Sequence, residues 1–117
     1  TGAGAVLHSH SIPATVLSQS HQANGHLSVE GLEMLKGLEG VTTHSTRIDI
    51  PVVANNQCMD VMVESFLPHL AAHSHGILVA GHGLYAWGRK LADAERHLEI
   101  LEFVLDVQLN WSRIQKS

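Results

Sequence analysis

Two histidines separated by one residue stand where an apolar run near the start of the chain ends. Residues 5–7 are Ala-Val-Leu, and His8 and His10 follow them in a pattern that indicates a buried strand. Successive side chains of a strand point to opposite faces, so His8 and His10 would share one face. His82 follows a second apolar run and lies between two glycines. Three imidazoles that leave a fourth position open are the arrangement of a catalytic zinc site, so the pattern predicts a metal centre formed by His8, His10 and His82.

The histidines also have simpler interpretations. On its own, a His-x-His pair is as consistent with two polar residues at the end of a strand as with a metal site, and the distant Gly-His-Gly motif is what favours the metal. Zinc suits three imidazoles, although manganese, iron or cobalt could occupy the same ligands. His69 and His73 are four residues apart on one predicted helix face, where a surface location is the stronger interpretation. The other histidines show no spacing typical of a metal site: His21, His26, His44, His75 and His97.

A metal that polarises a carbonyl and stabilises an enolate needs a partner that carries protons. Glu33, in the run Glu-Met-Leu-Lys-Gly, is the candidate. From spacing alone the simpler interpretation is stronger: an exposed carboxylate that pairs with Lys36 at i, i+3 and contributes only ~0.2–0.5 kcal/mol. Other carboxylates are equally eligible by composition, namely Glu30, Glu39 and Glu64. The acidic residues of the last predicted helix are expected on its solvated face: Asp93, Glu95, Glu99 and Glu102.

Composition restricts the class of protein. The 117 residues are 44% hydrophobic and 15% charged, which is typical of one small globular domain with a single core. The net charge is -4 and no basic patch with interleaved aromatics is present, so nucleic acid is not an expected partner. No apolar run is long enough to span a bilayer, so a membrane is not expected either. The single cysteine, Cys58, excludes an intrachain disulfide, fits a reducing compartment, and is interpreted as structural.

The hydrophobic pattern divides the chain into alternating strands and helices. Strands are expected over residues 5–9, 41–44, 48–53, 77–79 and 84–87, and Pro51 suggests an edge strand or a bend. Helices are expected over residues 12–19, 28–38, 59–70 and 91–113, the second with Ser28 as its N-cap. This alternation predicts an α/β fold in which helices cover a sheet. The start at Thr1, without an initiator Met, suggests that an N-terminal portion was removed or left out.

Three stretches resemble the methylthioribulose-1-phosphate dehydratases of the class II aldolase/adducin superfamily: residues 3–11, 30–37 and 79–88. The His-x-His and His-Gly motifs are common to the superfamily. The Glu-Met-x-Lys-Gly run and the Gly-His-Gly-Leu-Tyr-x-Trp-Gly run point to the dehydratase branch. The resemblance covers nearly the whole chain. It implies a three-layer α/β/α fold with a central mixed sheet, as one domain over residues 1–117 that lacks the N-terminal part of the family domain.

The resemblance also implies roles for the candidate residues. His8, His10 and His82 would hold one zinc ion per subunit, and Glu33 would be the catalytic acid/base, which reverses the order favoured by spacing. The implied reaction is the dehydration of 5-methylthioribulose 1-phosphate to 2,3-diketo-5-methylthiopentyl 1-phosphate in methionine salvage. The implied assembly is a cytoplasmic homotetramer with active sites near subunit interfaces. The alternatives are a class II sugar-phosphate aldolase or 4-epimerase on the same scaffold, and a non-catalytic, adducin-like interaction domain.

Two positions depart from the pattern of the family. Its phosphate-binding segment and its substrate-contacting cysteine lie upstream of the part that this chain matches, and Cys58 does not correspond to that cysteine. Ala80 stands where many relatives have arginine.

Overall fold

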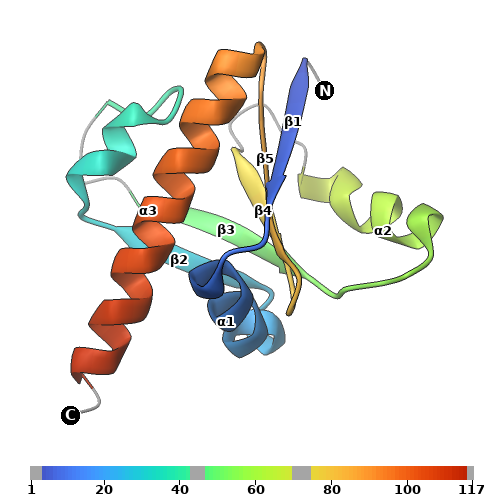
Figure 1. Cartoon of the computed structure of the whole chain (residues 1–117), viewed down its shortest axis with the longest axis horizontal. Helices are drawn as coiled ribbons and strands as arrows, with labels where there is room; N and C mark the ends of the chain where they lie inside the picture. Colours follow the sequence, from blue (N-terminus) through green and yellow to red (C-terminus); the bar gives the residue numbers. More distant parts are fainter. Residues whose placement is uncertain (1–3, 43–46, 70–74, 116–117) are drawn as a thin grey trace.

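One mixed sheet of five strands forms the centre of the molecule. The computed structural model describes residues 4–42, 47–69 and 75–115. Its strands are β1 (Ala5–Ser9), β2 (His26–Glu30), β3 (Arg47–Val53), β4 (Gly76–Val79) and β5 (Gly83–Gly88). They are ordered β1-β5-β4-β3-β2, and only β3 and β4 run parallel. The strands predicted near both histidine motifs are thereby confirmed (Figure 1).

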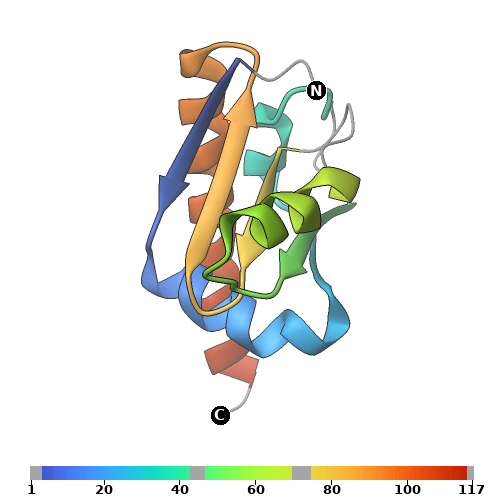
Figure 2. The same ribbon diagram turned by 90° about the vertical axis from the view of Figure 1, so that its right-hand side faces the viewer.

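Helices lie on both faces of this sheet. The α-helices are α1 (Ile12–His21), α2 (Met59–Phe66) and α3 (Leu91–Gln115), and short 3-10 helices are η1 (Gln22–Asn24), η2 (Glu33–Gly37) and η3 (Leu67–His69). Figure 2 shows α2 in front of the sheet and α3 behind it, with α1 crossing below. The predicted α/β fold with helices on both sides of a mixed sheet is confirmed. None of the helices in the described ranges has the apolar run that crossing a bilayer requires.

The core lies between the sheet and α3. Helix α3 buries residues at the spacing of one helix face, including Ala94, Leu101 and Leu105. Helix α1 adds Ala14 and Leu17 to the same core. Apolar packing therefore fills the centre of this face of the sheet.

The predicted helix that begins at Ser28 is wrong. Strand β2 occupies its start, and only the 3-10 helix η2 follows. Leu27 and Val29 are buried at alternate positions, the period of a strand, and β2 pairs with β3 over its whole length. The Ser28 hydroxyl does not cap a helix but donates a hydrogen bond to the Asp49 carboxylate at 2.6 Å. Cross-strand pairing and burial of two large side chains outweigh the local helical pattern.

Three smaller predictions also need comment. Residues 41 and 42 are not in a strand, and the rest of the strand predicted over 41–44 lies outside the described residues. Pro51 is not on an edge strand, because β3 lies between β2 and β4, and it occupies the position where pairing passes from one neighbour to the other. Helix α2 ends at Phe66 and continues as η3, and Leu70 is again outside the described residues.

Candidate metal centre

The structure brings the three predicted histidines together. His8 lies on β1, His10 directly follows β1, and His82 lies in the turn between β4 and β5. Their ligand nitrogens all lie within 4.8 Å of one another. The Nε2 atoms of His8 and His10 are 2.5 Å apart, and both rings have their centroids 4.9 Å from that of His82. His8 and His10 are exposed and His82 is half-buried, so a small molecule can reach the cluster.

The His8 ring is held in the tautomer that binds a metal through Nε2. Its Nδ1 lies 2.9 Å from the Leu84 carbonyl oxygen. A carbonyl can only accept, so Nδ1 carries the proton and Nε2 keeps its lone pair. Tyr85 stacks on the ring with centroids 3.9 Å apart. The pKa of His8 lies below its usual value, chiefly because partial burial disfavours the imidazolium. The hydrogen bond to Leu84 opposes this shift, and repulsion from His10 and His82 adds to it.

A tight turn presents His82. The His82 N–H donates to the Val79 carbonyl at 2.9 Å, and Gly81, third in this turn, has φ 67°, which favours glycine. The Gly81 N–H donates to the hydroxyl of buried Ser18 at 3.1 Å, which ties the turn to α1. The His82 Nδ1 lies 3.2 Å from Asn55 Oδ1. An amide oxygen accepts, so this contact also leaves Nε2 free for a metal.

The second glycine of the Gly-His-Gly motif serves close packing. A Cβ at Gly83 would lie 2.1 Å from the Ser9 carbonyl oxygen and 3.2 Å from Cε1 of His8. Any larger residue would therefore push β5 away from β1 beside the first ligand. The glycines that marked His82 in the sequence are explained by the turn and by this contact.

The donor set fits a divalent transition metal. Three imidazole nitrogens converge, and in two of the rings the other nitrogen is engaged by an oxygen acceptor, as in most histidine ligands of metal sites. Imidazole suits zinc, iron, cobalt and nickel, whereas magnesium and calcium prefer oxygen. The three protein donors leave coordination positions for a substrate.

Comparison with known proteins shows which family the chain belongs to. The sequence pattern of the Class II Aldolase and Adducin N-terminal domain matches residues 1–109. The chain belongs to this family. Its fold matches the crystal structure of l-fuculose-1-phosphate aldolase from Thermus thermophilus, with a TM-score of 0.68 and 27% identity over all of this chain and 58% of that one. The class II aldolase fold expected from the resemblance is thereby confirmed.

Curated relatives of this family member are dehydratases by name. The chain is 45% identical over 113 residues to the methylthioribulose-1-phosphate dehydratase of Xanthomonas campestris pv. campestris strain 8004. It is 46% identical over 113 residues to that of Stenotrophomonas maltophilia strain R551-3. These alignments cover 96% of this chain but 52% and 53% of the relatives. The chain thus spans about half the length of the curated relatives it matches.

Glu33, the predicted acid/base, lies on the other face of the sheet from the three histidines. It begins η2, which packs on α3 through buried Leu35, and it forms the predicted ion pair with Lys36 at 2.5 Å. His8 and His10 point away from α3, because Ser9 between them bonds Glu102 of that helix. Within one chain, therefore, the structure joins the three histidines but does not bring Glu33 to them.

Sequence spacing did not predict the hydrogen bonds of two polar residues, Glu102 and His97. Glu102, expected on the solvated face of α3, is half-buried and accepts hydrogen bonds from Ser9 and Ser11. His97 is 2% exposed, and both its ring nitrogens are used. Neither role leaves a local pattern, because the partners of each residue lie far away along the chain.

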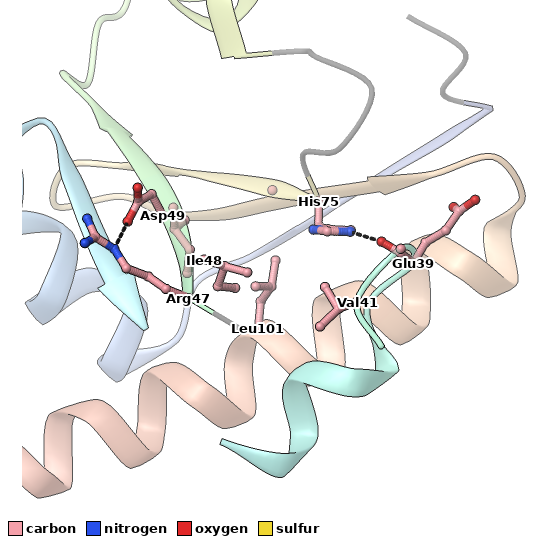
Figure 3. A pocket seen from close by; sticks show the side chains of 10 residues that line it. Glu39, Val41, Arg47, Ile48, Asp49, His75 and Leu101 are labelled. Atoms are coloured by element: carbon pink, nitrogen blue, oxygen red, sulfur yellow. Dashed lines mark hydrogen bonds and ion pairs between the residues drawn. The ribbon is translucent and has the colours of Figure 1, made fainter. Parts of the chain in front are cut away.

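A cavity of about 340 Å³ opens on the α3 face (Figure 3), lined in part by Glu39, Val41, Arg47, Asp49 and Leu101. None of the three clustered histidines lines it. Its charged groups are paired: Arg47 with Asp49 at 3.1 Å, and Glu39 with Arg89 at 3.4 Å. The cavity therefore presents no group poised for the chemistry of the histidine cluster.

Proposed function

We propose that the protein carrying this chain dehydrates 5-methylthioribulose 1-phosphate to 2,3-diketo-5-methylthiopentyl 1-phosphate, a step of methionine salvage. The observation that carries the proposal is the convergence of His8, His10 and His82 in a chain whose curated relatives are named methylthioribulose-1-phosphate dehydratases. Zinc is the proposed metal, one ion per subunit, because three imidazoles with an open position suit it.

The histidines have one task in this proposal. They are neutral imidazoles that would hold the ion through Nε2. The Leu84 carbonyl keeps the proton of His8 on Nδ1, and the Asn55 side chain does the same for His82. When bound, zinc would polarise the ketose oxygens and stabilise the negative charge left by proton removal. The exposure of the cluster leaves room for the substrate.

Glu33 is the proposed proton carrier. The hydrogen on C3 of the substrate is acidic because it lies next to the C2 carbonyl. The Glu33 carboxylate takes this proton and delivers it to the hydroxyl that leaves C4, so that one water is lost. The resulting 2-keto-3-enol rearranges to the 2,3-diketone. Atoms balance without a redox partner.

A second copy of the chain supplies Glu33 in this proposal. Within one chain, Glu33 is exposed and lies across the sheet from the histidines. The face that carries the histidines also exposes Val6 of β1. Helix α2, which lies over this face, exposes Met59, and Leu67 of the following η3 is exposed as well. Exposed apolar side chains gathered on one face are candidates for an association surface. They support the homotetramer expected from the resemblance, which we place in the cytoplasm.

The test is an assay of the protein, as expressed from its own gene, on 5-methylthioribulose 1-phosphate. Glu33→Gln should retain zinc and lose about 100-fold or more of the activity, the range for a general acid/base. Glu30→Gln, which alters another exposed carboxylate three residues earlier, is the matched control and should keep full activity. Full activity of Glu33→Gln would remove Glu33 from the mechanism.

Product analysis separates the proposal from the aldolase alternative, which the similarity to l-fuculose-1-phosphate aldolase favours. A dehydratase yields one five-carbon diketone phosphate, an aldolase two shorter fragments, and a 4-epimerase an isomer of unchanged mass. Mixing His82→Ala subunits with Glu33→Gln subunits tests the shared site. Mixed oligomers should recover part of the activity, and mixtures that exchange subunits but stay inactive would contradict a site built by two copies.

A further inference from the structure

A single carboxylate on α3 binds both residues that flank His10. Ser9 Oγ donates to Oε2 of Glu102, and Ser11 Oγ donates to Oε1 at 2.6 Å. Ser11 Oγ also accepts from the Ala14 N–H at 3.1 Å, as the N-cap of α1. The Ser11 hydroxyl thus donates one hydrogen bond and accepts another. Glu102, in the middle of α3, is thereby connected to the end of β1 and to the start of α1.

His10 is the least supported of the three clustered histidines. The pairing of β1 with β5 ends at Ser9, so His10 lies beyond the ladder. His8 is within the ladder and bonds Leu84, and His82 is held by its turn and by Asn55. Among the residues that the structure describes, no backbone or amide oxygen bonds the His10 ring. Its position depends on the backbone on either side of it.

Glu102 fixes that backbone from the opposite face. Ser11 has φ -97° and ψ 159°, so the chain stays extended past the end of β1. Side chains alternate along an extended segment. Ser9 and Ser11 therefore turn toward α3, while His8 and His10 turn toward the metal side. Holding both serines at one carboxylate sets where the Cα of His10 lies.

We infer that Glu102 is a positioning residue for the metal site: through Ser9 and Ser11 it holds His10 where its Nε2 meets those of His8 and His82. The inference rests on the proposed metal centre. It assigns to α3, which contributes no ligand, control over how tightly the site binds its ion. Groups that hydrogen-bond a ligand directly typically contribute about 10–100-fold to metal affinity, which sets the upper range for Glu102, because it acts through the two flanking serines.

The test is titration of Zn²⁺ and Co²⁺ into the metal-free protein and its variants. Glu102→Ala should weaken binding by up to about 10–100-fold. Glu102→Gln should weaken it less, because the amide oxygen still accepts one of the two hydrogen bonds. Glu99→Gln, an exposed carboxylate three residues earlier on α3, is the matched control and should bind as the wild type does.

Two readouts separate positioning from a loss of folding. Thermal unfolding of each metal-free variant fixes a temperature at which all are folded, and the titrations are done there. The visible spectrum of bound Co²⁺ should change in Glu102→Ala, because the set of ligands around the ion changes. Ser9→Ala, which removes one donor and leaves the cap of α1 intact, should weaken binding in the same direction.

Each outcome has one meaning. Wild-type affinity and an unchanged Co²⁺ spectrum in both Glu102→Ala and Ser9→Ala would overturn the positioning role, while the metal site would stand if His82→Ala fails to bind. A wild-type protein that binds neither ion, or a His82→Ala variant that binds as well as the wild type, would overturn the metal site and the positioning role together.

Discussion

The same side chain, histidine, has opposite uses in two regions of the molecule. In the core, His97 of α3 donates from Nδ1 to the Trp87 carbonyl at 2.7 Å and accepts at Nε2 from the Glu39 N–H at 3.1 Å. In the cluster at the end of β1, His8 and His82 engage only Nδ1 with an oxygen, and their second nitrogens face a shared point. A histidine whose second ring nitrogen is hydrogen-bonded to the backbone has a structural role. A histidine whose second nitrogen lies close to the nitrogens of other histidines is a candidate metal ligand.

Burial separates the two regions in the same way. His97 is 2% exposed, and its hydrogen bonds replace water at the carbonyl of buried Trp87 and at the Glu39 N–H. The clustered histidines are exposed or half-buried, and water could satisfy their nitrogens. The core histidine should therefore matter to folding and the clustered ones to binding.

The largest effect is expected on metal binding. His82→Ala removes one of three nitrogen ligands, so zinc affinity should fall by more than the ~10–100-fold that substitutions behind a ligand cost. The free energy of unfolding of the metal-free protein should change by no more than about 0.5 kcal/mol, as at other surface positions. Calorimetric titration and urea denaturation measure the two quantities. His26→Ala, an exposed histidine outside the cluster, is the control, and stoichiometric zinc in His82→Ala would break the distinction.

His97→Ala should show the reverse. It leaves the Trp87 carbonyl and the Glu39 N–H without their partner and opens a cavity, so unfolding should become about 2–4 kcal/mol easier. Zinc affinity per folded molecule should be unchanged. Urea denaturation of the metal-free protein checks the first expectation and titration the second. If stability were unaffected while zinc binding was lost, the assignment of His97 to the core would be wrong.

A smaller effect is expected from pH. The pKa of His8 lies below its usual value of 6.5 because burial disfavours its charged form. The unfolded chain therefore protonates His8 more readily than the folded chain does. The contribution of His8 to the free energy of unfolding is full above about pH 6.5 and is lost as the pH falls through the lowered pKa of the folded state. Urea midpoints of the metal-free protein should decline over that window, with a shallower decline in His8→Gln. Equal declines in both proteins would show that His8 contributes nothing to this dependence.

Local patterns predicted much of this molecule. The strand before His8, the strands around His82 and the long helix α3 follow from apolar runs and helical spacing that a short window contains. The convergence of three histidines was predictable because each stood at the end of such a run. Segment 28–38 carried a strand period and a helix period together, and only pairing with β3 decided between them.

Long-range contacts account for what the sequence did not predict. Ser11 and Glu102 are 91 positions apart, and Glu39 and His97 are 58 apart. No spacing rule connects such pairs, so Glu102 was predicted as a solvated carboxylate and nothing in the sequence distinguished His97. Spacing did not favour Glu33 over the other carboxylates, and the resemblance did. Its role stays a prediction that concerns an assembly of copies.

Zinc K-edge X-ray absorption of the zinc-loaded protein tests the three-histidine centre, because it reports the ligands of the bound ion. We expect about three imidazole nitrogens at about 2.0–2.1 Å, with the remaining ligands oxygen. Loss of one imidazole in His10→Ala would confirm that the signal comes from this cluster. A sulfur ligand at about 2.3 Å, which exposed Cys58 could supply, or a shell of oxygens alone would contradict a three-histidine centre.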